Sequence, residues 1–208
     1  LVAADAGAPV PFAVAAAAAA AMDSGLKAAF EAARSYSVNA ADWFGGLWRG
    51  LERGSVEDMV AVVPTGLGLH DLQRLGRLVT DIPAGFTADP KIAKFLAERR
   101  QGFETGTGIT WAAAETLALA SLANAGVPVR FGGQDCLRGA FTQRHWQLHD
   151  ANTGARHLVL AAAARDKAKL EVHNTPLIEH AVLCYEYGLS MDDPRRLVVW
   201  EAQFGEFL

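Results

Sequence analysis

Cysteine is scarce in this sequence, which has only Cys136 and Cys184 among its 208 residues. Two cysteines so far apart exclude a disulfide framework and a cysteine-based zinc site. We interpret both as reduced thiols of a cytosol or matrix, and we expect Cys184 to lie in the core. Positive charge is also limited, because 19 Lys and Arg stand against 23 Asp and Glu. No basic stripe with interleaved aromatic residues occurs, so a nucleic-acid partner is not expected.

Long, strongly apolar runs are missing as well. The alanine run 15–21 is too short and too weakly apolar for a membrane span, and no positively charged segment precedes it as in a secretory signal. A membrane partner is therefore not expected. The run predicts an alanine-rich helix that is broken near Ser24-Gly25 and resumes over 26–34. We assign 1–35 to the helical end of a preceding domain.

An aromatic and helical linker is predicted over 36–108. Its first part, DWFGGLWRGL at 42–51, gathers tryptophans around a glycine pair, and we favour docking over cofactor stacking for these tryptophans. Leucines at 69, 72 and 75 recur at helical spacing, and Pro90 opens a second helix that runs to Arg100. The polar, glycine-rich stretch 101–108 then marks a domain boundary.

The remainder, 109–208, alternates between helical and strand patterns. Thr110 caps a helix that Gly126 ends, and a strand over 127–131 runs into Gly132-Gly133. Glycines at the end of a strand let the backbone approach a ligand closely. The predicted fold is α/β, a parallel-rich sheet flanked by helices, and a 208-residue chain with 51% hydrophobic residues can bury its core.

The stretch 171–207 carries the main functional candidate. A strand over 171–173 precedes a helix, which Thr175 caps and Gly188 closes, and an apolar run over 197–200 predicts another strand. Glu179 then lies in the first turn of the helix, beside the loop that follows the strand. Open α/β sheets place their ligand sites at such strand ends, so Glu179 is the candidate acid.

Five blocks in this region resemble one known family. They read ITWAAAETLALASL, VRFGGQDCLRGAFTQRH, LHD, NTPLIEHAVLCYEYG and VVWEAQFGEF, in that order. Together they resemble the 2-oxo acid dehydrogenases of the 2-oxoglutarate type, the thiamine-diphosphate-dependent first components of large complexes. The resemblance covers about 109–208 and is weaker over 36–100.

The resemblance implies a transketolase-like pyrimidine-binding domain, truncated at its C-terminal side. The implied reaction decarboxylates a 2-oxo acid on thiamine diphosphate and passes the acyl unit to a lipoyl group on the acyltransferase component. It also implies a homodimer, in the mitochondrial matrix of a eukaryote or the cytoplasm of a bacterium. No Gly-Asp-Gly occurs in the sequence, so the ligands of the Mg²⁺ that holds the diphosphate are expected outside this chain.

Three alternatives stay open beside this interpretation. The chain is also compatible with a 2-oxoadipate dehydrogenase, which FTQRH and NTPLIEHAVLCYEYG suit equally. A transketolase-type enzyme shares the glycine-rich strand end and the catalytic carboxyl, but not WEAQFGEF. A non-catalytic interaction domain is the third alternative.

The resemblance assigns roles to particular residues. Glu179 matches the acid that bonds the cofactor's pyrimidine ring and relays a proton, although the family's S-L-S-E is P-L-I-E here. An acid in that role must be held out of bulk water. Phe204 and Phe207 follow the last strand, where family members place aromatic walls around the aminopyrimidine. Gln134 and Asp135, after the glycine pair, complete the expected cofactor contacts.

The loop 137–145 carries the substrate or interface candidates, Arg138, Arg144 and His145. Arginines suit a dicarboxylate substrate, but they could equally hold the loop against a partner subunit. The chain departs from the family at Ala140, where a threonine is usual, and at Gly132, where a serine is usual. For Glu115 a surface role and a buried role at a subunit interface are equally compatible with the pattern.

Overall fold

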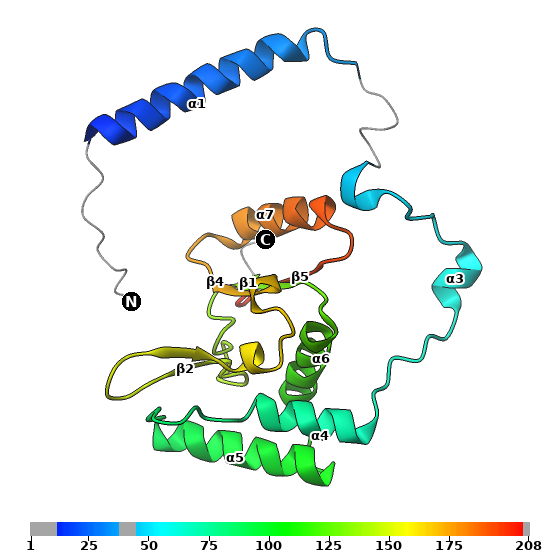
Figure 1. Cartoon of the computed structure of the whole chain (residues 1–208), viewed down its shortest axis with the longest axis vertical. Helices are drawn as coiled ribbons and strands as arrows, with labels where there is room; N and C mark the ends of the chain where they lie inside the picture. Colours follow the sequence, from blue (N-terminus) through cyan, green and yellow to red (C-terminus); the bar gives the residue numbers. More distant parts are fainter. Residues whose placement is uncertain (1–11, 38–44, 206–208) are drawn as a thin grey trace. The chain divides into compact units, whose positions relative to one another are not determined.

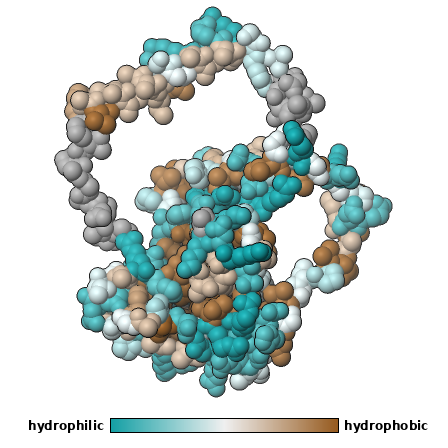
Figure 2. Space-filling view, viewed as in Figure 1, coloured by the Kyte–Doolittle hydropathy of each residue, from teal (hydrophilic) through white to brown (hydrophobic). Residues whose placement is uncertain are grey.

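The computed structural model describes residues 12–37 and 45–205. The chain divides into two units, 1–45 and 46–208, and we describe each by itself. In the first unit the helix α1 spans Phe12–Ala33 and has no buried residue (Figure 1). Figure 2 shows a weakly hydrophobic surface along it, as its alanines lead one to expect.

The predicted break in α1 near Ser24-Gly25 is wrong, because the helix continues through both residues. Alanines on both sides favour helix strongly enough to carry one glycine, whose cost is about 1 kcal/mol. Lys27 also reaches back to Asp23 at 2.6 Å, an i,i+4 pair that spans the glycine. The alanine run 15–21 is by itself too short for a membrane span, but the 22-residue helix that contains it is long and apolar enough to cross a membrane by length and composition alone.

Three helices form one layer of the second unit. They are α4 (Leu69–Leu78), α5 (Pro90–Thr105) and α6 (Trp111–Ala125), preceded by a short 3-10 turn η1 (Gly46–Trp48) and by α3 (Val56–Val60). Asp89 caps α5 by accepting from the Lys91 N–H at 2.8 Å, and Pro90 occupies the first position as predicted. The helix continues past Arg100 and ends where Gly106 adopts the left-handed conformation.

A parallel sheet lies between this layer and α7. Its strand order is β4 (Leu170–Asn174), β1 (Val129–Gly133) and β5 (Leu197–Glu201), with β1 in the centre. Both pairs are parallel, and Gly133 is in register with Asn174 and Glu201. The helix α7 (Glu179–Asp192) covers one face, while α6, α4 and α5 lie on the other side (Figure 1). The predicted α/β fold with a parallel sheet is confirmed.

The helix α7 begins and ends later than predicted. Thr175 and Pro176 belong to the turn that leaves β4, because the Thr175 N–H donates to the carbonyl of Gly133 at 2.9 Å. Gly188 lies inside the helix, which continues to Asp192. The helix stops shortly before Pro194, as expected because a residue before proline disfavours helical angles.

The core is continuous from the helical layer to the sheet. Trp146 is fully buried against Phe131 of β1, edge to face at 5.1 Å, and donates its indole N–H to Thr116 of α6 at 2.9 Å. The antiparallel pair β2 (Gln147–His149) and β3 (Arg156–Leu158), followed by the 3-10 turns η2 (Val159–Ala162) and η3 (Lys167–Lys169), completes the unit. Cys136 is buried but Cys184 is exposed, so its predicted core position is wrong.

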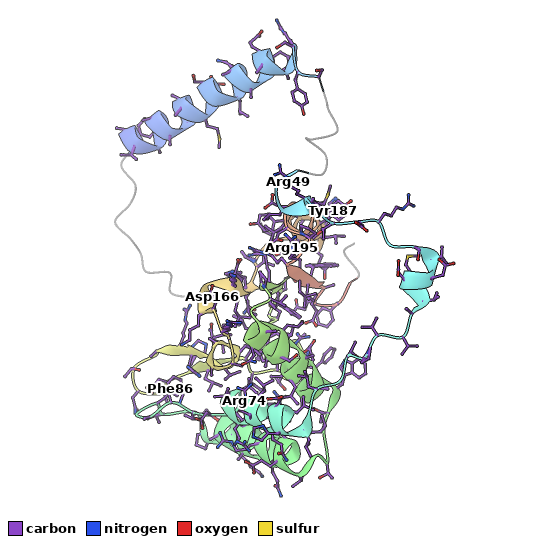
Figure 3. All side chains as sticks on the ribbon, turned by 45° about the vertical axis from the view of Figure 1, so that its right-hand side comes forward. Arg49, Arg74, Phe86, Asp166, Tyr187 and Arg195 are labelled. Carbon is purple, nitrogen blue, oxygen red and sulfur yellow. The ribbon has the colours of Figure 1, made fainter. Side chains whose placement is uncertain are left out.

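The aromatic segment docks on the far end of α7. The Trp48 indole donates to the carbonyl of Met191 at 2.8 Å, and Arg195 donates to the carbonyl of Leu47 at 2.9 Å. Figure 3 shows Arg195 and Tyr187 near Arg49, which follows η1. Trp48 therefore has a docking contact, whereas Trp43 lies outside the described residues.

Candidate functional site

The loops after β1 and β4 are joined at the carboxyl edge of the sheet. Gln134 donates from its side chain to the carbonyl of Leu177 at 2.8 Å. The Asn174 side chain accepts the Leu137 N–H at 3.0 Å. Cys136 donates to the His173 carbonyl at 3.2 Å, and burial raises the pKa of its thiol to about 12. These bonds give the predicted ligand edge a defined shape.

The glycine pair Gly132-Gly133 at this edge leaves room for other parts of the chain. A Cβ on Gly132 would lie 2.5 Å from Oε1 of Glu186, and one on Gly133 would lie 2.4 Å from the carbonyl oxygen of Glu201. Both glycines therefore admit a neighbouring part of the protein itself. The close contacts observed at these glycines are with a carboxylate and a backbone oxygen of the chain, and the predicted close approach to a ligand stays a prediction.

Glu179 is the first residue of α7, and it is 2% exposed. The Gly205 N–H donates to its Oε1 at 3.3 Å, which joins the segment after β5 to the start of the helix. Leu177 and Ile178, which precede Glu179 in the sequence, are themselves 53% and 69% exposed. Val182, one turn further along the helix, is buried together with Glu179. A buried acid at the sheet edge fits the needs of a proton relay.

The aromatic candidates lie after β5. Phe204 is 65% exposed and directly precedes Gly205, so its segment is beside Glu179 and offers an aromatic face to a ligand. Phe207 lies outside the described residues. The role of Phe204 toward a cofactor stays a prediction.

Asp135, Arg138 and His145 line one cavity of about 330 Å³, together with Asn174 and His149. Asp135, in a left-handed conformation, accepts from Nε of Arg138 at 2.9 Å. Burial lowers the pKa of His145, and the positive charges of Arg99 and Arg138 lower it further. The cavity carries both charge signs, and apolar residues such as Ile92 and Leu148 form part of its lining.

Arg144 lies inside the protein rather than in that cavity. It is 3% exposed, and its guanidinium is bound by Glu115 of α6, at 2.7 Å and 2.9 Å, and by both carboxylate oxygens of Glu201 at the end of β5. Burial opposes its charge, but the bonds from Glu201 and Glu115 raise its pKa above the ordinary value. Arg144 thus holds its loop against the chain's own sheet and helix. The position of Glu115 is explained by the same bond.

Arg99 clamps the same loop from α5. It donates to the backbone carbonyls of Gln143 at 2.7 Å and Arg144 at 3.1 Å, and burial lowers its pKa to about 10. Its guanidinium lies 4.4 Å from the ring centre of Phe95. The roles of Arg138, Arg144 and His145 toward a substrate or a partner stay predictions.

A buried ion-pair network two helical turns along α7 from Glu179 was not predicted from the sequence. The inner face of α7 carries Glu179, Val182 and Glu186, whereas Ile178 and Tyr185 are exposed. Glu186 binds Arg130 of β1 through two bonds. The spacing of the glutamates could have indicated the network, because Glu186 follows Glu179 by seven residues, or two helical turns, and so lies on the same face of the helix.

The described residues, 12–37 and 45–205, contain no cluster of three or more His, Cys, Asp and Glu side chains placed to hold a metal ion. The expectation that the magnesium ligands lie elsewhere stays a prediction.

Comparison with known proteins identifies the C-terminal part of the second unit. Residues 107–208 match the family described as transketolase, pyrimidine binding domain. Among curated relatives, the chain is 43% identical over 182 residues to proteins named 2-oxoglutarate dehydrogenase E1 component, from Brucella ovis, Brucella anthropi and Brucella canis. These alignments cover 88% of this chain and 18% of each relative, so the chain spans about a fifth of their length. The resemblance recognised in the sequence is confirmed.

Proposed function

Because residues 107–208 form a transketolase-type pyrimidine-binding domain, we propose that this chain is part of a 2-oxoglutarate dehydrogenase E1 component. In this proposal the whole enzyme decarboxylates 2-oxoglutarate with thiamine diphosphate and passes the acyl unit to a lipoyl group on the acyltransferase component. The observation that carries the proposal is the burial of the Glu179 carboxyl at the start of α7, next to the carboxyl edge of the parallel sheet.

When bound, thiamine diphosphate supplies the carbon nucleophile that attacks a 2-oxo acid. Glu179 would bond the N1′ atom of the pyrimidine and hold or release a proton at its carboxyl group. Burial suits this task because it removes water that would compete for the same bond. Gly205 orients the carboxyl through its N–H, which donates to Oε1 at 3.3 Å.

Other residues of this chain would bind and orient the pyrimidine. Phe204 would place its exposed ring along one face of the heterocycle, with Phe207 as the second predicted wall. Gln134 would form part of the pyrimidine site, since its side chain already holds the loop before α7 by donating to the carbonyl of Leu177. Asp135, which accepts a hydrogen bond from Arg138, would lie beside this site at the carboxyl edge of the sheet.

The quaternary and cellular setting belongs to the same proposal. The enzyme would be a homodimer in which the diphosphate and Mg²⁺ are held by residues outside this chain. The face of α6 with Trp111, which is 91% exposed, and Ala118 would offer an apolar surface for such contacts. The compartment would be the mitochondrial matrix in a eukaryote and the cytoplasm in a bacterium.

Glu179→Gln in the full-length enzyme tests this function. The amide keeps the shape of the side chain but cannot relay a proton, so we expect folding to stay nearly intact. Hydrogen–deuterium exchange at the reactive thiazolium carbon should fall by about 10²-fold or more. Calorimetry of cofactor binding serves as the control for an intact site. Exchange at the wild-type rate, with cofactor bound, would exclude Glu179 as the relay acid.

A further inference from the structure

The inner face of α7 carries two buried acids separated by two turns. Glu179 is 2% exposed and Glu186 is 3% exposed, with Val182 between them at 3%. Glutamates are rarely buried without a partner, since burying an unpaired charge is costly. Two acids on one packed face therefore indicate a specific arrangement rather than ordinary packing.

Glu186 forms a bidentate ion pair, called the grip below, with Arg130 of the central strand. Arg130 donates from Nε to Oε2 at 2.7 Å and from Nη2 to Oε1 at 2.9 Å, a fork that fixes both distance and orientation. Gly132, two residues further along β1 and on the same face, makes room for this carboxylate, because a Cβ there would lie 2.5 Å from Oε1. The grip therefore sets how closely α7 approaches the sheet.

Arg130 is itself fixed to the neighbouring strand. Its Nη1 donates to Oε2 of Glu171 at 2.6 Å, and these two residues are register partners of β1 and β4. Arg196, just before β5, donates to Oε1 of Glu171 at 3.0 Å. The hydrogen bonds to Glu186 are the main cause that raises the pKa of Arg130. Burial opposes the charge of Glu171, but the nearby Arg130 and Arg196 outweigh it and lower the pKa of Glu171. The network thus connects β1, β4 and the residue that precedes β5 to the helix.

A helix is stiff over two turns, so a grip on Glu186 determines where Glu179 lies. The two Cα atoms are separated by about 10 Å along the helix axis. A slip or rotation of α7 would carry the Glu179 carboxyl away from the sheet edge. We propose that Arg130 and Glu186 are positioning residues for Glu179, fixing the rotation and register of α7 so that this carboxyl meets the cofactor. The inference rests on the proposed function of Glu179.

The first test uses the cofactor-free, full-length enzyme. In Glu186→Gln we expect faster amide deuterium uptake over 179–186, because the charged fork is lost. Leu96→Ala is the matched control: this buried residue of α5 lies outside the network, so its loss destabilises the protein without releasing α7. Each variant is measured at the same interval below its own melting temperature. Equal uptake over 179–186 in both variants would overturn the positioning role.

The second test is a double-mutant cycle on deuterium exchange at the thiazolium carbon, at saturating cofactor. Glu186→Gln alone should slow exchange by about 10- to 100-fold, the effect expected when a reacting group is misplaced by about 1 Å. In a Glu179→Gln background it should slow exchange no further, because a positioning residue acts only through the group that it positions. Effects that multiply would overturn the inference.

Arg130→Lys provides a second variant in case Glu186→Gln does not fold. Lysine keeps the positive charge but not the fork, so a smaller slowing is expected, again absent in the Glu179→Gln background. The remaining outcomes distinguish failure of the positioning role from failure of the proposed function. If Glu179→Gln slows exchange while the two network variants exchange at the wild-type rate, the positioning role alone is wrong. If Glu179→Gln exchanges at the wild-type rate, the proposed function fails and the inference fails with it.

Discussion

Replacing Arg144 by methionine should destabilise the chain strongly. The variant leaves two carboxylates, Glu115 and Glu201, without their shared cation, and it places an apolar side chain where that of Arg144 is 4% exposed. Removing one partner of a buried ion pair costs about 3–5 kcal/mol. Contacts of the guanidinium with Phe131 and Trp146, each at 4.9 Å, add to the loss.

We place the expected loss at the lower end, about 3 kcal/mol, because Glu115 and Glu201 keep side-chain exposures of 27% and 31% and are partly hydrated after the change. For a domain of this size the melting temperature should fall by roughly 6–12 °C. Urea unfolding and calorimetry measure both quantities. Adding Glu115→Gln to the variant should recover part of the loss, since one uncompensated charge is removed.

Lys94→Ala is the surface control for this experiment. Lys94 faces Glu98 at 3.8 Å, with side-chain exposures of 79% and 65%, and such pairs contribute about 0.5 kcal/mol or less. A loss below about 1 kcal/mol in the Arg144 variant, comparable with this control, would refute the reasoning that burial makes the Arg144 cluster energetically important.

Three further predictions concern other parts of the second unit. Gly133→Ala should cost about 1–3 kcal/mol in unfolding free energy, because its Cβ would meet a backbone oxygen at 2.4 Å; Gly188→Ala, where the space is open, should stabilise α7 slightly. Asp150, whose pKa is lowered to about 2 chiefly by backbone hydrogen bonds, stabilises the fold above its unfolded pKa of about 4. That stabilisation is lost as the pH falls toward 2, so acid titration of Asp150→Asn should show a flatter dependence between these values. A thiol reagent at neutral pH should label Cys184 rapidly and leave buried Cys136 unmodified, as mass spectrometry of the native protein would reveal; equal labelling would contradict the packing.

Local sequence signals determined several elements of the second unit. Thr110 and Gly126 bound α6 as their chemistry predicts, and Asp89 with Pro90 starts α5. These are interactions between residues a few positions apart, which a single sequence displays directly. The α/β fold and the position of Glu179 at the start of a helix follow from the same kind of pattern, supported by the family resemblance.

Where competing local signals occur, the tertiary structure decided the outcome. Thr175 has the side chain of a helix cap, yet its N–H is taken by the carbonyl of Gly133, so α7 starts four residues later at Glu179. Gly188 is a sound helix terminator by composition, but the helix passes through it to Asp192. In both cases the local preference of the residue to start or end a helix, about 1 kcal/mol, is too small to decide where α7 starts or ends.

The sequence by itself determined the strand–helix alternation, the principal helix caps and the acid at the sheet edge. Only the tertiary structure decided that Gly132 admits Glu186, that Arg130 grips this residue, and that Arg144 turns inward to Glu201. The physical reason is separation along the chain: Arg130 and Glu186 are 56 residues apart, and Arg144 and Glu201 are 57 apart. Charged side chains so distant have no preferred partner until strand order and helix rotation bring two of them within bonding distance in a water-poor interior, where the pairing becomes obligatory.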